Sequence, residues 1–363
     1  MAQFWQVLVV RALVQIPIAV LQVNPNLNLE ISVKHYPCRM RGGGNPPPTN
    51  PLSVINVNQS VLKTIDDSPA VEWQSEILPL GNGFIGASTY GGVKSERILI
   101  NEHKKFEKEK QKMKVMSFNL RVPAADDGIN YFDNRKERIL EVLRREKPDL
   151  IGFQEVRIEG KEWLWKELCD EYIILGCGRN ENCGREYVPV AIRREPFELV
   201  KMETFWLSDT PDVPGSRYEN LDQSMCVRIA TTVSLYHKES KKMIRFANTH
   251  TDHAGKEARK KELTQILEYL DACPGYKIIT GDMNAGPDSE EIQAFLKGAS
   301  KYNVKDCTAD LGDTFHGFGK YGGKIDYIFS DMNVLESHVI PDIPVNGVYY
   351  SDHRAVCADL EII

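Results

Sequence analysis

The stretch IITGDMNAGP (residues 278–287) runs from an apolar, β-branched segment through a glycine into a carboxylate and a carboxamide, and it ends at Gly-Pro. In a strand, residues i and i+2 lie on the same face, so Asp282 and Asn284 would point to one side if the strand continues. The flanking glycines would let the backbone turn beside a ligand. Alone, the stretch is also typical of an Asx-rich turn after a strand. The ends of the other expected strands distinguish these two interpretations.

Apolar runs elsewhere in the chain end in polar residues too. These residues are Asn119 after MSF, Glu155 after LIGFQ, His250 after FANT, Asp326 in KIDYIF, and Asp352 and His353 after VYYS. Ionisable groups are rarely buried unless they are paired or functional. Carboxylates and histidines that follow strand after strand therefore predict a functional site at one rim of a β-sheet.

Segments with strand-like and helix-like periodicity alternate from Met113 to the end of the chain. The expected strands are 114–120, 149–156, 187–192, 229–236, 243–250, 277–280, 324–329 and 355–362. The expected helices are 133–146, with Asp133 or Asn134 as N-cap, 161–172 and 257–271. Helices that lie between strands are typical of a layered α/β fold.

The ordered motifs MSFNLR, GFQEVR, NTH, GDMN, IDYIF and SDH resemble the endonuclease/exonuclease/phosphatase superfamily, which includes DNase I. The resemblance covers residues 113–363. TFWLSDTPDVPGSR (204–217) and DTFHGF (313–318) further resemble a small branch of that superfamily. The resemblance implies a four-layered α/β sandwich, in which two central β-sheets are flanked by helices, with a divalent metal at the sheet rim.

The resemblance also implies a role for each polar strand end. The metal environment would consist of Asn119, Glu155 and Asp352. Asp282 and Asn284 would orient the attacking water and the phosphate. His250 and His353 would flank the scissile phosphate.

Three further residues would support this set. Asp326 would hold His353, and Glu186, in GREYVPV, would hold His250. The substrate would be bound by Arg157 (in QEVR), Asn284 and His250.

Independently of the family resemblance, these residue types are suited to phosphoester hydrolysis. Mg²⁺ or Mn²⁺ takes oxygen ligands and neutralises charge on the non-bridging oxygens. A histidine between a carboxylate and a phosphate can hold a proton near neutral pH. The residues also have non-functional interpretations. Glu155 would then be a surface carboxylate and His250 a core histidine, while Glu186 and Arg157 would be solvated charges.

Three aromatic residues in the branch-specific motifs have two interpretations. Trp206, Phe315 and His316 are equally consistent with a stacking wall for a base or sugar and with core packing.

The first 112 residues have a different composition. Residues 1–67 include the Pro- and Gly-rich stretch 37–53 and are expected to be a poorly ordered segment and linker. Residues 68–102 have the pattern of a β-hairpin and resemble the amino-terminal opening of bacterial α-L-fucosidases. The charged run 103–112 is expected to be a solvated connector. We therefore expect three parts, 1–67, 68–112 and a catalytic domain at 113–363.

Composition limits the partners. With a net charge of −6 over 363 residues, the chain lacks the excess of basic residues that is typical of proteins that bind long nucleic acids. The eight cysteines form no CxxC motif and are expected to be mostly reduced, although Cys177 and Cys183 would be able to pair in a secreted protein. Arg11 and Pro17 interrupt the apolar amino terminus, so we expect neither a signal peptide nor a membrane span, and no membrane partner. We expect a soluble monomer, with the compartment, cytoplasmic or secreted, left open.

The sequence thus favours a divalent-metal-dependent phosphoesterase that cleaves a phosphodiester or phosphomonoester by in-line attack of water. The substrate would be a small molecule or a nucleic acid, so a DNA or RNA nuclease is an alternative. A non-catalytic binding protein on the same fold would lack some of these residues, but none is missing. A glycosidase is disfavoured because residues 68–102 hold no acid and nucleophile pair.

Overall fold

The computed structural model describes residues 111–363, apart from the side chain of Ala125, and only the backbone of six strands within residues 1–110. The chain divides into two compact units, Met1–Glu109 and Lys110–Ile363. No helix among the described residues is long and apolar enough to cross a membrane.

The six strands of the first unit form two antiparallel sheets. They are β1 (Gln6–Val10), β2 (Ala19–Val23), β3 (Glu30–Pro37), β4 (Pro51–Val57), β5 (Ile85–Ser88) and β6 (Ser95–Glu102). β1 pairs with β2, and the other sheet has the order β4-β3-β6-β5. The antiparallel pairing of β5 with β6 agrees with the hairpin expected in 68–102. Four strands lie within 1–67, where we expected no regular structure. Part of one of them, EISVK, alternates polar and apolar residues, which is typical of a strand. Residues 103–110 of the charged run lie outside the described residues.

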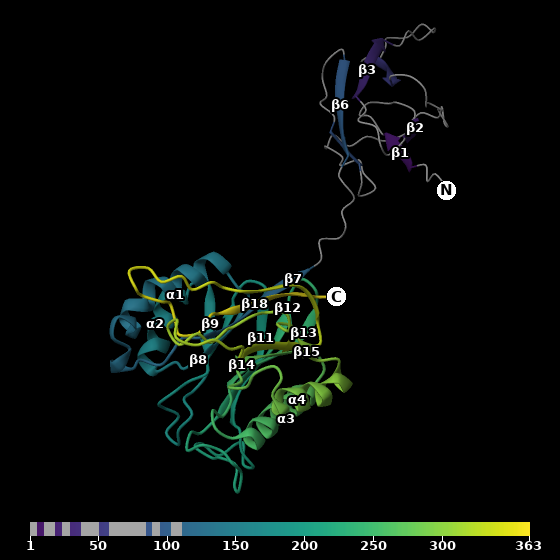
Figure 1. The fold of residues 1–363 in the computed structure, drawn as a ribbon. Coiled ribbons are helices and arrows are strands. Elements are labelled where there is room, and N and C mark those ends of the chain that lie inside the picture. Colours follow the sequence, from purple (N-terminus) through teal and green to yellow (C-terminus); the bar gives the residue numbers. More distant parts are fainter. Residues whose placement is uncertain are drawn as a thin grey trace. The chain divides into compact units, whose positions relative to one another are not determined.

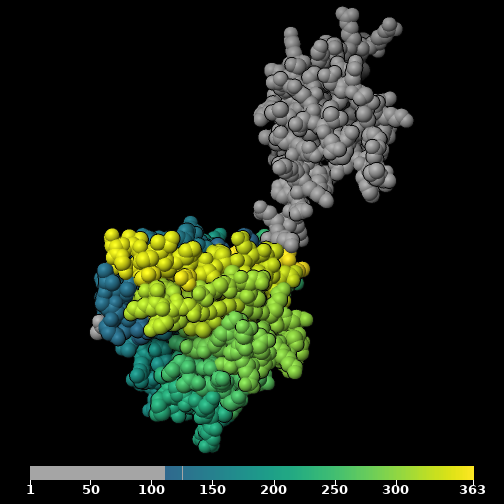
Figure 2. Space-filling view, viewed as in Figure 1, coloured from purple at the N-terminus to yellow at the C-terminus, as the bar shows by residue number. Residues whose placement is uncertain are grey.

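The second unit contains two six-stranded sheets. The first sheet has the order β17 (Asn333–Val339), β18 (Val356–Glu361), β7 (Lys112–Asn119), β8 (Leu150–Gln154), β10 (Val190–Arg193) and β9 (Tyr172–Leu175). The second has the order β11 (Phe197–Trp206), β12 (Ile229–His237), β13 (Lys242–His250), β14 (Tyr276–Asp282), β16 (Asp326–Ser330) and β15 (Lys305–Asp306). On the face shown in Figure 2, yellow residues from the carboxyl-terminal end border blue residues from the start of this unit. Inside the fold, β18 pairs with β7.

Helices cover the outer face of each sheet, as Figure 1 shows. The helices are α1 (Phe132–Glu146), α2 (Ile158–Leu168), α3 (Lys256–Asp271) and α4 (Glu290–Ala299), with short 3₁₀ segments η1 (Ala125–Asn130) and η2 (Ser300–Tyr302). Apolar side chains alternate along the strands and fill three buried layers. Phe118 packs toward α1 and α2, Val115 packs between the sheets, and Phe329 packs toward α3 and α4. The predicted four-layered α/β sandwich is confirmed.

Two strand pairs bring the polar strand ends to one rim. β7 and β8 are parallel, with α1 between them in the chain, and β13 and β14 are parallel, with α3 between them. The carboxyl ends of parallel neighbours lie at the same edge of a sheet. Asn119 and Gln154 are therefore neighbours in the first sheet, and His250 and Asp282 are neighbours in the second.

A buried polar seam joins the two sheets one step below this rim. Asn248 accepts a hydrogen bond from Gln154 Nε2 at 2.7 Å and from Thr280 Oγ1 at 3.0 Å, and its own Nδ2 donates to Phe153 O at 2.7 Å. Gly152 lies against this group: a Cβ there would be 2.1 Å from Thr280 Oγ1 and 2.3 Å from Asn248 Oδ1. The sheets approach so closely here that only glycine fits.

Several local expectations differ from the structure. The N-cap of α1 is Tyr131, not Asp133 or Asn134, and no side chain caps the helix; Asp133 lies in the first turn and pairs with Lys136. The helix expected over 161–172 ends at Leu168, since Tyr172 begins β9. The strands β9, β11 and β17 and the helix α4 were not expected. β11 and β17 are sheet edges with mostly exposed or half-buried residues, so they lack a clear apolar alternation.

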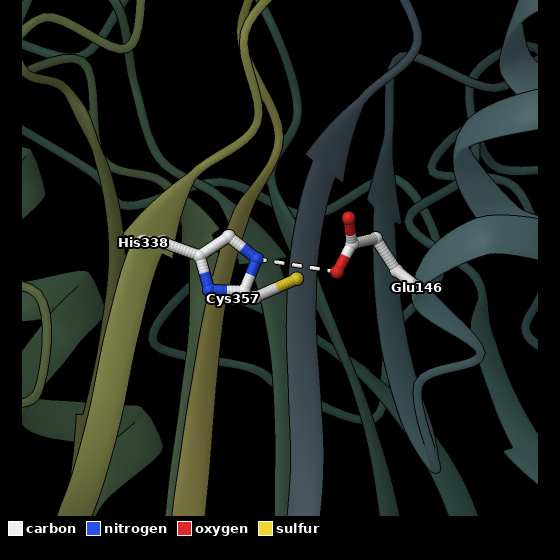
Figure 3. A group of neighbouring side chains, drawn as sticks. All are labelled: Glu146, His338 and Cys357. Carbon is white, nitrogen blue, oxygen red and sulfur yellow. Dashed lines mark hydrogen bonds and ion pairs between the residues drawn. The ribbon is translucent and has the colours of Figure 1, made fainter.

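The carboxyl end of α1 is tied to the edge of the first sheet, as Figure 3 shows. Glu146 Oε2 lies 3.2 Å from His338 Nε2 on β17 and accepts a hydrogen bond from Lys114 Nζ at 3.3 Å. Burial raises the pKa of Glu146, but hydrogen bonds from Arg145, His338 and Lys114 outweigh it and hold the pKa below its usual value. Cys357 lies beside this pair. Because Lys114 already binds the oxygen that faces His338, we interpret this group as a structural tether.

We predict that Gly152→Ala destabilises the second unit by about 2 kcal/mol or more, because the methyl group overpacks the polar seam. The matched change is Gly298→Ala on the exposed side of α4, where a Cβ meets no atom within 4 Å. That variant should gain up to about 1 kcal/mol from helix propensity. Urea unfolding of both variants checks the pair. Equal stabilities would show that the sheets can separate without cost.

We also predict that a shortened chain beginning at Lys110 folds alone, because both sheets and their cores lie within Lys110–Ile363. Its melting temperature should match that of the full chain within about 2 °C, corresponding to less than ~1 kcal/mol. Thermal unfolding followed by circular dichroism measures this. Aggregation of the shortened chain, while the full chain stays in solution, would show that the first unit is needed.

Candidate active site

The rim shared by the two sheets gathers the polar strand ends that the sequence singled out. β7 ends at Asn119, β13 at His250 and β14 at Asp282, while β16 begins at Asp326. His250 is in register with Asp282, and Asp282 with Asp326. The residues are buried, with exposed fractions of 8% or less for these four.

Asp282 is the centre of the group. Its Oδ2 accepts a hydrogen bond from Asn119 Nδ2 at 3.0 Å. The same oxygen lies 3.6 Å from His250 Nε2 and 3.6 Å from His353 Nε2. Burial raises the pKa of Asp282 to about 7, and the charges of Asp326 and Glu155 raise it while that of His353 opposes them. A carboxylate between two imidazoles with a pKa near neutrality is suited to accepting a proton.

The two histidines are held in opposite charge states. His353 Nδ1 lies 2.9 Å from Asp326 Oδ2. Burial lowers the pKa of His353, but the carboxylates of Asp326 and Asp282 outweigh it and raise the pKa to about 10. Burial and the charges of Arg228 and Arg179 lower the pKa of His250 well below its usual value. At neutral pH His353 is therefore protonated and His250 is neutral.

Glu186 lies beside His250 but is bound elsewhere. His250 Nδ1 is 3.8 Å from Glu186 Oε1 and has no hydrogen-bond partner. The carboxylate accepts a hydrogen bond from Arg179 Nη1 at 2.6 Å instead. Burial raises the pKa of Glu186, although Arg179 opposes the shift. The sequence analysis missed Arg179, which carries no strand-end signal because it lies in the loop between β9 and β10.

Glu155 has an unusual backbone conformation. Its φ of 57° lies in the left-handed region, which costs a non-glycine residue about 1–3 kcal/mol. Its side chain accepts hydrogen bonds from Asn119 Nδ2 at 3.1 Å and from Val122 N at 2.8 Å. Burial acts to raise the pKa of Glu155, but the Val122 N–H, the charge of His353 and these other contacts lower it. The carboxylate is thus held ionised at a fixed position.

The expected alternation at Asp282 and Asn284 is wrong, and the turn interpretation is correct at this point. β14 ends at Asp282, and Asn284 has a φ of 48°. Asn284 N donates to Asp282 Oδ1 at 2.9 Å, which forms an Asx turn, and Asn284 Nδ2 donates to Thr251 O at 3.0 Å. The turn nevertheless keeps Asn284 at the rim beside Asp282.

Arg121 contacts both Asn119 and Asp352, and Arg135 holds the backbone beside them; the sequence analysis missed both arginines. Asn119 Oδ1 accepts from Arg121 N at 2.8 Å, and Arg121 Nε lies 3.7 Å from Asp352 Oδ2. Arg135 is fully buried and donates to the carbonyls of Leu120 and Tyr350 at 2.7 and 2.9 Å. Arg121 follows Asn119 closely in MSFNLR, which is the signal that was available for it.

The predicted phosphate contact, Arg157, is the exposed N-cap residue of α2. Among residues 111–363 its side chain forms no hydrogen bond or ion pair. Its charge is close enough to Glu186 to oppose the rise in that residue's pKa. Arg157 is therefore free to bind an anion near the rim.

The two interpretations left open for Trp206, Phe315 and His316 apply to different residues. Trp206 is buried and donates its Nε1–H to Arg179 O at 2.6 Å, and His316 is buried with a pKa lowered by burial to about 4. Phe315 does line the rim, with its ring centroid 4.9 Å from that of His353. Tyr321 stacks on Phe315 at 5.9 Å and is 67% exposed. The sequence analysis missed Tyr321, which lies beyond the DTFHGF motif.

The acidic groups at the rim fit a divalent cation. Burial raises the pKa of Asp352, and the carboxylate of Glu155 adds to the rise. Glu155, His250 and Asp282 offer ligand atoms that all lie within 4.8 Å of one another, and so do Asp282, Asp326 and His353. The raised pKa values of Asp282 and Asp352 show that His353 and Arg121 do not fully balance the negative charge here, and a hard cation with oxygen ligands would balance it further. The amide oxygen of Asn119 keeps a second lone pair beside its bond to Arg121.

Comparison with known proteins identifies the family. The sequence profile described as "Endonuclease/Exonuclease/phosphatase family" matches residues 116–353, so the chain belongs to this family, whose members are hydrolases acting on phosphoester bonds and generally use a divalent metal. The profile of the glycosyl hydrolase family 65 N-terminal domain matches residues 65–112, where the fucosidase-like fragment was recognised.

Solved structures agree with this assignment, and the chain is also similar to a curated protein of uncharacterized function. The crystal structure of an endonuclease/exonuclease/phosphatase from Bacteroides vulgatus is 30% identical, with a TM-score of 0.64, and the match covers 70% of this chain and 100% of the other. A mannosyl-6-phosphatase of Bacteroides thetaiotaomicron is 26% identical, with a TM-score of 0.62, over 69% of this chain and 100% of its own. An uncharacterized protein of Acanthamoeba polyphaga mimivirus, L388, is 28% identical in an alignment 250 positions long, which covers 62% of this chain and 90% of that protein.

We predict that Asp282→Asn changes the pH dependence of stability in the presence of a chelator. A carboxyl group whose pKa is raised in the folded state contributes stability below its unfolded pKa of 3.8, and this is lost as pH rises through about 7. Asn does not titrate. The variant should therefore gain stability relative to the unchanged protein between pH 5 and 7, by up to about 1.4 kcal/mol per pH unit.

Urea unfolding at each pH measures this difference, and Asp310→Asn at an exposed position is the control. Added Mg²⁺ should stabilise the unchanged protein more than the Asp282→Asn variant. A difference that stays constant across the pH range would mean that Asp282 is not under the electrostatic strain described above.

Proposed function

We propose that this protein is a divalent-metal-dependent phosphoesterase that hydrolyses a phosphodiester or phosphomonoester by in-line attack of water. The observation that carries the proposal is the placement of Asp282 Oδ2 at 3.6 Å from both His250 and His353. A base with a raised pKa thus lies between two imidazoles, one neutral and one protonated. Apolar side chains at this rim would stabilise the fold at least as well as these buried charged groups, so stability alone does not explain the arrangement.

The metal would be Mg²⁺ or Mn²⁺, held by Glu155, Asn119 and Asp352, and it would neutralise charge on the phosphoryl oxygens. Arg121 fixes this set, because its backbone N–H binds Asn119 Oδ1 and its guanidinium lies 3.7 Å from Asp352. The left-handed backbone of Glu155 fixes the direction of its carboxylate.

The protein's own residues would carry out the proton transfers. Asp282, positioned by Asn119 and by Asn284 N, accepts a proton from the attacking water. The new bond forms between the water oxygen and phosphorus, the ester P–O bond breaks opposite to it, and the leaving oxygen takes a proton from solvent water to become the alcohol. Protonated His353, held by Asp326, donates its Nε2–H to a phosphoryl oxygen as charge develops. General acid–base help of this type contributes about 10²–10⁴-fold.

His250 and Arg157 would bind the phosphoryl group from the other side. His250 is neutral and donates a single N–H, while Arg157 supplies a full positive charge from the start of α2. Asn284 lies beside Asp282 and completes the polar wall.

A small phosphoester is favoured over a long nucleic acid. The net charge of −6 disfavours the many phosphate contacts on which non-specific DNA binding depends. The mannosyl-6-phosphatase relative, at 26% identity, supports a phosphosugar among the substrates. We therefore rank a nuclease second. A purely binding role is disfavoured because every predicted metal, base and histidine position is filled.

We predict that chelator-stripped protein hydrolyses bis-p-nitrophenyl phosphate or p-nitrophenyl phosphate only after Mg²⁺ or Mn²⁺ is added. Asp282→Asn and His353→Ala should each lower kcat by about 10²-fold or more, because they remove the base and the charged donor. Release of p-nitrophenolate measures the turnover.

The matched controls are Asp310→Asn, an exposed carboxylate, and His338→Ala, the histidine of the tether at Glu146. Both should keep the turnover within about twofold, since neither contacts the rim. The proposal fails if turnover survives in Asp282→Asn and His353→Ala, or if it is insensitive to the chelator.

A further inference from the structure

A polar pocket of about 500 Å³ opens between two loops next to the candidate active site. The loop between β9 and β10 contributes residues 179–182 and Arg185. The loop between β11 and β12 contributes Gly215 and residues 225–227. This volume lies within the range of about 300–1,000 Å³ that small-molecule sites occupy.

The pocket is built by fixed backbone contacts. Gly178 N donates to Cys183 O at 2.9 Å, and a Cβ at Gly178 would be 2.2 Å from Gly184 O, so the first loop closes tightly on itself. Gly215, with a φ of 79°, lets Glu181 of the first loop approach the second; a Cβ there would be 2.4 Å from Glu181 Cγ. The pocket is therefore preformed rather than created by a ligand.

Two more hydrogen bonds hold the loop between β9 and β10 in place. Trp206 Nε1 donates to Arg179 O at 2.6 Å, and Arg179 N donates to Glu186 O at 3.0 Å. Cys177 and Cys183, which the sequence left as a conditional pair, are both free thiols here. The backbone hydrogen bonds hold this loop without a disulfide.

The pocket shares a wall with the phosphoryl site. Arg179 lines the pocket and binds Glu186 at 2.6 Å. Glu186 lies 3.8 Å from His250, which in turn lies 3.6 Å from Asp282. In the second sheet His250 is on β13, on one side of β14, whereas Asp326, which holds His353, is on β16 on the other side. A group bound in the pocket thus lies across the Arg179–Glu186 pair from His250, on that side of the scissile phosphate.

The chemistry of the lining is that of a hydroxyl-rich ligand. Asn180 and Asn182 offer both donors and acceptors, Glu181 accepts, and Arg185 donates. The side chains of Asn180, Glu181 and Arg185 form no hydrogen bond or ion pair with other residues of 111–363, so these groups are available. Of the described residues that line the pocket none is aromatic, which disfavours a nucleobase, since bases are recognised by stacking.

We infer that this pocket binds the alcohol part of the substrate, and that this part is a sugar or another polyol. The inference rests on the proposed phosphoesterase activity and deepens it by naming the substrate class. The hydroxyl groups are bound by Asn180, Glu181 and Arg185, while the phosphoryl group lies between His250 and His353. The scissile P–O bond joins the two, and the product alcohol remains in the pocket after it breaks.

The test compares two esters in one double variant, Asn180→Ala with Arg185→Met. p-Nitrophenyl phosphate has an aromatic leaving group without hydroxyls, whereas a hexose 6-phosphate has several. The variant should raise KM for the hexose phosphate about tenfold or more, as expected from the loss of two hydrogen-bonding groups. Its turnover of p-nitrophenyl phosphate should stay within about twofold. Arg144→Met, on the exposed face of α1, is the matched control.

A nucleoside 5′-monophosphate is the competing ligand. The inference is overturned if the double variant leaves hexose phosphate kinetics unchanged, or if it impairs the nucleotide and not the hexose phosphate. Equal losses on all three esters, including p-nitrophenyl phosphate, would show damage to the rim and would also overturn it. A melting temperature close to that of the unchanged protein excludes a folding defect.

Failure of the proposed activity gives a different result. In that case the unchanged protein hydrolyses none of the three esters with any metal. Calorimetric titration with hexose 6-phosphate then tests the pocket without catalysis. Binding that weakens about tenfold in the double variant would support the pocket alone, and binding that is equal in both proteins, or absent from both, would overturn it.

Discussion

The seam between the two sheets determines where the rim chemistry lies. Asn248 on β13 binds Gln154 and the carbonyl of Phe153 on β8, and Gly152 permits the close approach. A buried polar group without partners is costly, so these hydrogen bonds can form in one register only. Glu155 follows Gln154 directly, and His250 comes two residues after Asn248. The hydrogen bonds of the seam therefore set the position of Glu155 in the first sheet relative to His250 in the second.

The rim concentrates negative charge at buried positions, and this shifts the pKa values of its carboxylates and histidines. Asp282 and Asp352 have raised pKa values, and the same carboxylates raise the pKa of His353. On the other side, burial lowers the pKa of His250, and the positive charges of Arg228 and Arg179 add to the fall. Two identical side chains thus acquire opposite charge states from their neighbours. A divalent cation bound at the rim would relieve the repulsion among the carboxylates, and metal binding would then be coupled to stability and to chemistry.

The fold and most of the rim could be predicted because both depend on local patterns in the sequence. A polar residue at the end of an apolar run can be recognised from the sequence alone. For this reason Asp282, His250 and Glu155 could be expected at one rim of the sheets. Arg135 was missed because its contacts lie across the fold, and Arg179 and Tyr321 were missed because loop conformation, not strand or helix periodicity, brings them to their partners. Arg179 faces Glu186 through a loop closure, and Arg135 reaches the Tyr350 carbonyl from a distant helix. The turn at Asn284 and the left-handed Glu155 depend on tertiary packing, which periodicity does not encode.

The most direct measurement of the central claim is a crystal structure of the protein with Mn²⁺ and inorganic phosphate, in which anomalous scattering locates the ion. The account predicts an ion against Glu155, with Asn119 and Asp352 around it, and a phosphate between His250 and His353. An ion bound only at Glu146, His338 and Cys357, with no phosphate at the rim, would contradict it.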